Sequence, residues 1–252
     1  MNELTLFNGL IIGWFVLAAI VFLSLFFVVA PYGRHARSGW GATIDNRAGW
    51  VIMEAVAPLI FAACFLLGNN NSPAVLILFG LWEAHYLHRA FIYPFSLHGR
   101  AKRLPLVIMG FALVFNGVNG YLNGRYIFTF ASSYGNEWLK DPRFIIGVLL
   151  FIAGFIINRQ SDRILRNLRS SDESGYSITH AGLYRWVSSP NYLGELIIWL
   201  GWALATWSLP GLAFAVWAAA NLIPRARSHH AWYRNNFPDY PPERKALVPG
   251  IW

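Results

Sequence analysis

Long apolar runs separated by short polar stretches organise this chain. Each run is bounded by charged residues or by glycine, asparagine and proline, which mark turns. The seven runs are Thr5–Ala30, Ala48–Leu67, Ala74–Pro94, Leu104–Gly124, Ile145–Asn158, Leu193–Leu209 and Gly211–Ile223. Because a bilayer-spanning helix needs roughly 20 mostly apolar residues, the pattern predicts an all-α, polytopic membrane protein with seven transmembrane helices. Pro210, between the last two runs, predicts a tight hairpin.

The composition supports a membrane protein over a soluble one. Of the 252 residues, 56% are hydrophobic and only 13% are charged. The single cysteine, Cys64, lies inside an apolar run, so we expect neither a disulfide framework nor a cysteine metal site. No loop is long enough to hold a second domain, so residues 1–252 are predicted to form one membrane domain.

The formal net charge of +8 would suggest a nucleic-acid partner in a soluble protein. Here the positions of the basic residues give another explanation. Of the 20 Lys and Arg residues, 16 lie in the loops after runs one, three and five or in the C-terminal tail, and Arg89 lies close to them. Only Arg125, Lys140 and Arg143 lie on the other side. Since basic loops face the cytoplasm, we predict an outside N-terminus, a cytoplasmic C-terminus and no nucleic-acid partner.

Polar stripes mark the predicted cytoplasmic ends of three helices. Residues four apart share a helix face, and those eleven apart nearly do. The stripes are Asn158, Asp162 and Arg169 at the end of run five, Asn191 and Glu195 at the start of run six, and Arg225, His229 and Tyr233 beyond run seven. Guanidinium groups pair bidentately with phosphate, so converging stripes favour a nucleotide site. The alternative is that each stripe faces solvent or lipid headgroups.

A carboxyl and a phenol form a second candidate site. Glu54 in run two and Tyr86 in run three both lie roughly 10–12 Å below the same predicted membrane surface, at 1.5 Å per residue. Two antiparallel neighbouring helices would bring them together, and a Tyr held by a buried carboxyl can donate a hydrogen bond to a substrate carbonyl. The alternative is a structural ion pair of Glu54 with Arg89 or His85.

Other polar residues give weaker signals. His85 and His88 are too few for a metal site, and no acidic cluster adds ligands, so no metal is predicted. The chain has no G-x-G-x-x-G fingerprint and no P-loop, so a bound nucleotide is not held by a Rossmann fold. Asn116, Asn119 and Asn123 alternate with glycines, which favours helix packing over chemistry.

Several motifs give the chain a close resemblance to the steroid 5-alpha-reductase (3-oxo-5-alpha-steroid 4-dehydrogenase) family. In the C-terminal part they are Gly182–Glu195 (GLYRWVSSPNYLGE), Ala203–Pro210 (ALATWSLP), Asp239–Pro241 (DYP) and Arg244–Pro249 (RKALVP). Upstream matches are Tyr32–His35 (YGRH), Glu54, His85–Arg89 (HYLHR) and the segment from Asn158 to Arg169. The resemblance therefore covers nearly the whole chain, and its C-terminal part is specific.

This resemblance implies a seven-helix membrane reductase that passes hydride from NADPH to C5 of a 3-oxo-Δ4 steroid. Glu54 and Tyr86 match the catalytic pair that polarises the 3-oxo group. The positions matching cofactor contacts are Asn158, Asp162, Arg169, Tyr176, Asn191, Glu195, Arg225, His229 and Tyr233, completed by Tyr32, His35, Arg89, Tyr93 and Arg100. Residues 1–125 would supply the substrate-side helices, and 143–252 the reductase region with most of the NADPH site.

The resemblance also sets expectations for partners and location. We expect a monomer in the bacterial inner membrane or the endoplasmic reticulum membrane, taking a steroid-like substrate from the surrounding lipid. Two departures from the family motifs bear on the cofactor and substrate contacts. Leu97-His98-Gly99-Arg100 replaces the Asn-Arg-Gly-Arg of mammalian members, and Met53 stands where a Gln can occur. Alternatives are a polyprenal or enoyl-thioester reductase, a membrane S-adenosylmethionine-dependent methyltransferase, and a transporter or lipid-binding protein. A methyltransferase needs no carbonyl-polarising acid, so Glu54 with Tyr86 argues against it.

Overall fold

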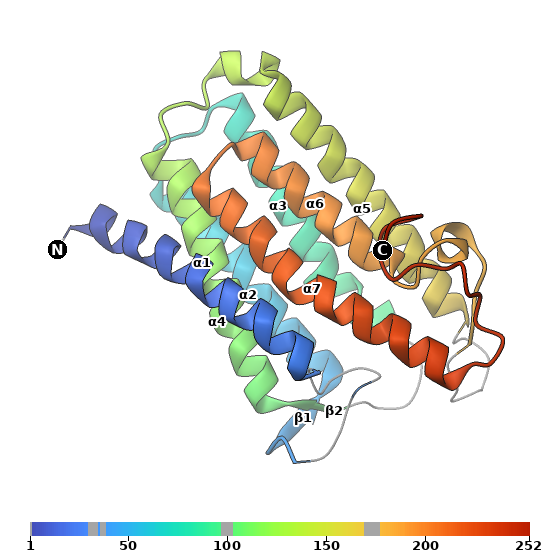
Figure 1. The fold of residues 1–252 in the computed structure, drawn as a ribbon. Coiled ribbons are helices and arrows are strands. Elements are labelled where there is room, and N and C mark those ends of the chain that lie inside the picture. Colours follow the sequence, from blue (N-terminus) through green and yellow to red (C-terminus); the bar gives the residue numbers. More distant parts are fainter. Residues whose placement is uncertain (1, 30–34, 36–38, 97–102, 169–176) are drawn as a thin grey trace. The chain divides into compact units, whose positions relative to one another are not determined.

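A computed structural model describes residues 2–29, 35, 39–96, 103–168 and 177–252 (Figure 1). These residues are mostly helical, as predicted. The α-helices are α1 (Glu3–Phe27), α2 (Asn46–Leu67), α3 (Pro73–Leu87), α4 (Leu106–Arg125), α5 (Pro142–Leu168), α6 (Pro190–Thr206) and α7 (Leu209–Asn236). Short π-helical segments follow α3 (η2, His88–Ile92) and α4 (η4, Tyr126–Phe130), and 3-10 turns occupy η3 (Pro94–Ser96), η5 (Asn136–Lys140) and η6 (Gly182–Arg185).

Each α-helix overlaps one of the predicted apolar runs. Among the described residues, four stretches are long and apolar enough to cross a bilayer: Glu3–Phe27, Asn46–Leu67, Leu106–Phe130 and Pro142–Leu168. Helices α3 and α6 are shorter, with 15 and 17 residues, and α7 carries several arginines in its second half. The membrane character of the chain is therefore supported, whereas seven spans and the orientation of the termini stay predictions.

The all-α prediction missed one small element, a pair of antiparallel strands. Strand β1 (Thr43–Asp45) pairs with β2 (Arg103–Pro105), with Thr43 opposite Pro105. The Arg103 guanidinium reinforces the pair by donating to the Thr43 hydroxyl at 3.0 Å and to the Thr43 carbonyl at 2.8 Å. Because β1 leads directly into α2 and β2 into α4, the pair brings the starts of these two helices together.

The chain divides into two compact units. Unit 1 comprises Met1–Val29, Ile146–Ala205 and Leu212–Trp252, and unit 2 comprises Ala30–Ile145 and Thr206–Gly211. The first helix therefore belongs with the C-terminal helices and not with α2, α3 and α4. The prediction of a single domain with a substrate-side part at 1–125 stays a prediction.

In unit 2, α2 packs between α4 and α3. Glycines on α4 allow the close approach to α2, because a Cβ added at Gly120 would lie 2.9 Å from the Ala57 carbonyl oxygen. On the other side, the Phe61 ring of α2 stacks on Trp82 of α3, with ring centroids 4.5 Å apart. This packing holds α2, which carries Glu54, against α3, which carries Tyr86.

In unit 1, α6 lies between α5 and α7, and α1 lies along α7 (Figure 1). A Cβ added at Gly154 of α5 would meet the Gly194 carbonyl oxygen of α6 at 2.6 Å, so the two backbones are in contact. The Trp199 ring of α6 stacks on Phe214 of α7 at 3.9 Å. Trp217 of α7 donates through Nε1 to the Trp14 carbonyl of α1 at 2.9 Å.

The predicted hairpin between α6 and α7 is present, but its turn precedes Pro210. Trp207 adopts a positive φ of 42°, which lets the chain reverse direction immediately after α6. The Ser208 hydroxyl then accepts from the Gly211 backbone N–H at 3.1 Å and so caps the start of α7. Pro210 lies in the first turn of α7, where its missing N–H costs no helical hydrogen bond.

Candidate functional site

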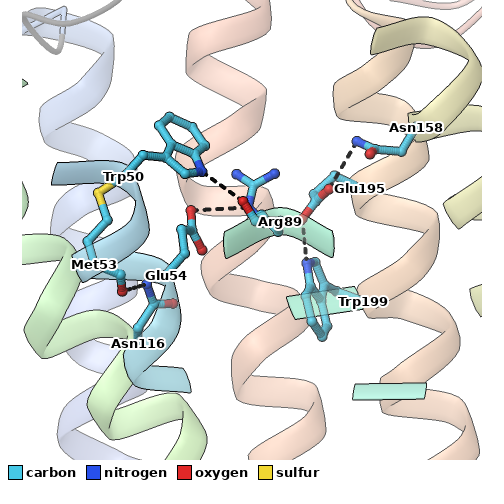
Figure 2. Close-up of polar contacts among 8 residues, drawn as sticks. All are labelled: Trp50, Met53, Glu54, Arg89, Asn116, Asn158, Glu195 and Trp199. Carbon is cyan, nitrogen blue, oxygen red and sulfur yellow. Dashed lines mark hydrogen bonds and ion pairs between the residues drawn. The ribbon is translucent and has the colours of Figure 1, made fainter. Parts of the chain in front are cut away.

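Glu54 is a buried carboxylate held by an arginine of the neighbouring segment. It lies on α2 with 7% of its surface exposed, and Arg89 Nε lies 3.1 Å from its Oε1 (Figure 2). Burying an ionised carboxyl without a partner is costly, and the guanidinium offsets that cost. Pairing with Arg89 was the structural alternative to catalysis for Glu54, and the ion pair is present.

The position of Arg89 depends on the π-helical segment η2. There the Tyr93 backbone N–H bonds to the His88 carbonyl at 2.8 Å instead of to the Arg89 carbonyl. The next residue, Pro94, has no N–H to offer. The Arg89 carbonyl is satisfied instead by Trp50 Nε1 of α2, at 3.1 Å (Figure 2). The widened turn, a feature frequent at functional sites, thus locks α2 to the end of α3.

Trp50 was missed in the sequence. Its ring lies 5.4 Å from the Arg89 guanidinium and 5.5 Å from the Tyr93 ring. The signal was available, because Trp50 precedes Glu54 by one helical turn and so shares its face. We call Trp50, Glu54, Arg89 and Tyr93 the Glu54 cluster.

Tyr86 is on α3, one turn before Arg89, and only 2% of its surface is exposed. Its ring lies against Trp82 at 5.0 Å and edge-on to His85 at 5.2 Å. The phenol is thus fixed in orientation by aromatic neighbours on its own helix. Glu54 and Tyr86 come from adjacent, packed helices, as the proposed catalytic pair requires, and their roles stay a proposal.

A buried amide supports the backbone just before Glu54. Asn116 Nδ2 of α4 donates to the Met53 carbonyl at 2.7 Å (Figure 2). Pro58, inside α2, lacks the N–H that would bond the Glu54 carbonyl and loosens the helix around it. Asn116 therefore secures a weakened turn, which agrees with the packing role predicted for the Asn116 series.

Replacing Asn116 with Leu is expected to destabilise the protein by about 0.5–1.5 kcal/mol, because the buried hydrogen bond from its side chain to the Met53 carbonyl is lost. Thermal unfolding of the detergent-solubilised protein measures this. Val114→Leu introduces the same side chain at a position of α4 that is 60% exposed, and should change the midpoint little. Equal shifts in the two variants would contradict the supporting role of the amide.

The first two polar stripes converge where the second half of α5 meets the start of α6. Asn158 Nδ2 donates to the Asn191 carbonyl at 3.0 Å. It also donates to Glu195 Oε2 at 3.0 Å (Figure 2). Asn191 Nδ2 in turn donates to Asp162 Oδ1 at 3.3 Å. The other Glu195 oxygen accepts from Trp199 Nε1 at 3.2 Å. These hydrogen bonds hold both carboxylates in fixed positions between two helices.

The third stripe reaches the same region through a residue that was not predicted, Tyr192. Arg225 Nε of α7 donates to the Tyr192 hydroxyl at 2.7 Å. The His229 ring lies 5.3 Å from the Tyr192 ring. Tyr192 directly follows Asn191, so the Arg225–His229 face of α7 adjoins the hydrogen-bonded end of α6. Asn158, Asp162, Asn191, Tyr192, Glu195, Arg225 and His229 are called the unit 1 cluster below.

The remaining predicted site residues lie apart from these contacts or outside the described residues. Tyr233 is buried one turn beyond His229 on α7, and His35 is partly buried. Tyr32, Arg100, Arg169 and Tyr176, like the departure at Leu97, fall outside the described residues. Within the described ranges, no three His, Cys, Asp or Glu side chains gather as metal ligands would.

One buried hydroxyl beside the unit 1 cluster has no hydrogen-bond partner among the described residues. Ser189 directly precedes α6, only 1% of its surface is exposed, and its Oγ is unsatisfied. An orphaned polar atom of this kind indicates a ligand group or water. With amides, a guanidinium and aromatic rings nearby, the donor set fits a phosphate- and ring-bearing cofactor such as NADPH.

Known proteins match the chain over most of its length. A family model for 3-oxo-5-alpha-steroid 4-dehydrogenase matches residues 102–252. The steroid 5-alpha-reductase DET2 of Gossypium hirsutum is 36% identical over 258 residues, covering 100% of this chain and 99% of the relative. The 3-oxo-5-alpha-steroid 4-dehydrogenase 1 of Bos taurus is 40% identical over 239 residues, covering 92% of each chain. That of Macaca fascicularis is 41% identical over 226 residues, covering 88% and 84%.

These matches include the segments that carry both clusters. They favour the reductase prediction over a methyltransferase or a transporter, since the relatives are named as oxidoreductases. The Gossypium hirsutum match covers all of this chain, including α2 and the polar ends of α5, α6 and α7. The chain accordingly belongs to the 3-oxo-5-alpha-steroid 4-dehydrogenase family, membrane oxidoreductases that act on CH–CH groups.

Proposed function

We propose that this protein uses NADPH to reduce the Δ4 double bond of a 3-oxo-Δ4 steroid, giving a 5α-reduced product. The observation that carries the proposal is the near full-length similarity to relatives named for this reaction. The buried Glu54 and Tyr86 on packed helices support it, because an enone is reduced faster when its carbonyl oxygen is polarised. Apolar helices suit a flat lipid that enters from the bilayer.

In the proposed reaction, Tyr86 donates a hydrogen bond to the 3-oxo oxygen and Glu54 orients and polarises that donor. Bound NADPH would supply the hydride that C5 accepts. As the electrons of the C4–C5 double bond shift towards the oxygen, Tyr86 stabilises the developing negative charge. C4 then takes up a proton and the carbonyl re-forms. Both side chains are buried, so bulk water competes little for these hydrogen bonds.

The cofactor is proposed to be held mainly by the unit 1 cluster and Tyr233. Arg225 provides a guanidinium for phosphate, Asn158 and Asn191 provide amides, and Tyr192 provides a ring. Arg89, Tyr93 and His35 are proposed contacts from the family resemblance alone. Tyr32, Arg100, Arg169 and Tyr176 are proposed from the family resemblance. Seven membrane spans, an outside N-terminus, a cytoplasmic C-terminus and a monomeric state complete the proposal.

The test is NADPH consumption by the purified, detergent-solubilised chain with testosterone or progesterone. Absorbance follows the cofactor, and mass spectrometry with NMR identifies a 5α-reduced product. NADH serves as the alternative reductant, and a polyprenal and an enoyl thioester serve as alternative substrates. Binding of NADPH without steroid turnover would remove the steroid from the proposal. No binding of NADPH would overturn it.

Replacing Arg225 with Met is expected to weaken NADPH binding about tenfold, because a charge-assisted hydrogen bond to phosphate is lost. The KM for the steroid should stay unchanged. Titrating the quenching of protein fluorescence by NADPH measures the Kd. Arg227→Met is the matched control, since Arg227 is exposed and its guanidinium lies over Phe26 of α1 at 5.5 Å. Equal weakening in both variants would show a non-specific charge effect and contradict the assignment.

A further inference from the structure

The C-terminal tail is fastened to the segment that leads into α6. Val187 and Lys245 form an isolated parallel bridge. The Ser188 backbone N–H donates to the Lys245 carbonyl at 2.8 Å, and the Lys245 N–H donates to the Trp186 carbonyl at 2.9 Å. Arg244, which is almost fully buried, adds a hydrogen bond from its guanidinium to the Thr179 carbonyl at 3.1 Å. The tail is therefore an ordered part of unit 1.

The Ser188 hydroxyl is the centre of a three-element hydrogen-bond network. Its Oγ lies 2.6 Å from His230 Nδ1 of α7, 2.6 Å from the Tyr240 hydroxyl of the tail, and 3.1 Å from the Lys245 carbonyl oxygen. A carbonyl can only accept, so the one hydroxyl proton of Ser188 goes to Lys245. Tyr240 and His230 Nδ1 must then both donate to Oγ. In this arrangement all these groups are satisfied, and both lone pairs of Ser188 Oγ are engaged, so the hydroxyl is not poised as a nucleophile.

Each member of this network adjoins a residue proposed to bind the cofactor. Ser188 precedes Asn191 by less than one helical turn, and His230 directly follows His229. The Tyr240 ring stacks on the Tyr233 ring, with centroids 5.3 Å apart and planes 10° apart. Positions on α6 and on α7 are thus linked through one buried hydroxyl.

We propose that Ser188, His230 and Tyr240 form a C-terminal latch that positions the α6 and α7 parts of the cofactor site. This inference rests on the proposed function, because it assigns the latch residues to the support of NADPH binding. They are positioning residues that do not touch the cofactor themselves. Without the latch, the start of α6 and the second half of α7 would keep their helical bonds and the Arg225–Tyr192 hydrogen bond, but would lose the second tie through Ser188 that fixes their separation.

The latch also contains a titratable group among cations. Burial lowers the pKa of His230 below its usual range, and Arg234 of α7 with Arg244 and Lys245 of the tail lowers it further. Tyr240 is the other ionisable group in contact with it. Neutral His230 already donates through Nδ1, so protonation adds only charge repulsion. His230 binds a proton less tightly when the latch is formed than when it is open. The latch is therefore fully stable above the usual His pKa of about 6.5, and its stability falls as the pH drops below that value.

The experiment compares the full chain with Ser188→Ala, Tyr240→Phe and His230→Asn in two measurements. Fluorescence titration gives the Kd for NADPH between mildly acid and neutral pH. Hydrogen–deuterium exchange of the cofactor-free protein follows peptides containing Ser188, Lys245 and the first turn of α6. Asp239→Asn, an exposed neighbour of Tyr240, is the matched control. Asn at position 230 keeps a donor near the place of Nδ1 but cannot titrate.

We expect Ser188→Ala and Tyr240→Phe to exchange faster in these peptides and to bind NADPH at least about fivefold more weakly, since Ser188→Ala removes all three hydrogen bonds of Oγ and Tyr240→Phe removes one. His230→Asn should bind NADPH as the parent does at neutral pH, and its affinity should not weaken as the pH is lowered. Unchanged exchange, or faster exchange with an unchanged Kd, would overturn the latch. If NADPH binding by His230→Asn still weakens at acid pH, the proposed role of His230 protonation is overturned. If the parent chain itself fails to bind NADPH, the proposed function fails, while exchange still reports whether the latch orders α6.

Discussion

Replacing Glu54 with Gln or Tyr86 with Phe is expected to lower steroid reduction about a hundred- to a thousandfold. Each change removes one part of the group that stabilises negative charge on the 3-oxo oxygen, and losses of this size follow removal of a single such donor. The Kd for NADPH should change little in Tyr86→Phe, because the phenol hydroxyl is proposed to act on the substrate. Single-turnover rates with saturating steroid measure the chemical step separately from binding.

The ion pair with Arg89 requires a control, because Glu54→Gln also leaves a partly buried guanidinium without its anion. The double variant Glu54→Gln with Arg89→Met removes both charges. If Glu54 is catalytic, the double variant regains thermal stability but no activity. If Glu54 serves only to neutralise Arg89, a Glu54→Gln variant that remains folded would keep its turnover, which would contradict the proposal.

Glu83 is the matched control for the loss of a carboxyl. It lies on α3 one turn before Tyr86, and its side chain is half-buried. Glu83→Gln makes the same chemical change on the same helix as Tyr86, outside the proposed pair. We expect turnover within about twofold of the parent chain. A loss of turnover as large as that of Glu54→Gln would mean that any acidic group near Tyr86 affects the rate. It would contradict a specific role for Glu54.

Periodicity was enough to predict the polar stripes and their convergence. Asn158 and Asp162 are four apart, as are Asn191 and Glu195, and both pairs interrupt or border apolar runs. A polar residue in such a place must find a polar partner, so two stripes at the same membrane depth were expected to meet. The hydrogen bonds from Asn158 to Glu195 and from Asn191 to Asp162 bear this out.

Contacts that depend on local breaks in a helix were not predictable in this way. Trp50 reaches the Arg89 carbonyl only because η2 diverts the Tyr93 N–H and Pro94 has none. Asn116 finds the Met53 carbonyl at a turn that Pro58 weakens. Whether a proline makes a π segment, a kink or a helix end depends on its tertiary neighbours. The sequence shows the prolines but not those outcomes.

The neighbours of α1 were likewise beyond sequence reasoning. In a bilayer, a helix face that packs on protein and one that faces lipid are both apolar, and α1 is apolar all around. Its pairing with α7 through Trp14 and Trp217 leaves no polar signature in the sequence. The C-terminal latch escaped prediction for a different reason, since Ser188, His230 and Tyr240 are far apart in the chain and none has a periodic partner.

Replacing Gly194 with Ala is expected to disrupt unit 1 more than any other conservative change considered. A Cβ at this position would lie 2.5 Å from the Asn158 backbone nitrogen and 2.8 Å from the Gly154 carbonyl oxygen. Both contacts are with backbone, so no side-chain rotation relieves them, and α5 must move away from α6. Overpacking lowers stability by about 1–3 kcal/mol where neighbours can adjust. Because the α5–α6 pair is rigid, we expect Gly194→Ala to lose stability at the upper end of this range.

The same displacement separates Asn158 from Glu195 and Asn191, so Gly194→Ala should also weaken NADPH binding at least about tenfold. Gly13→Ala is the matched control, because Gly13 lies on α1 in the same unit and a Cβ there meets nothing within 4 Å. Alanine is the better helix former by about 1 kcal/mol, so the control should unfold at the parent temperature or above. Thermal unfolding and NADPH titration of both variants test the pair. A Gly194→Ala protein with parental stability and affinity would mean that α5 and α6 do not hold the cofactor residues through this contact.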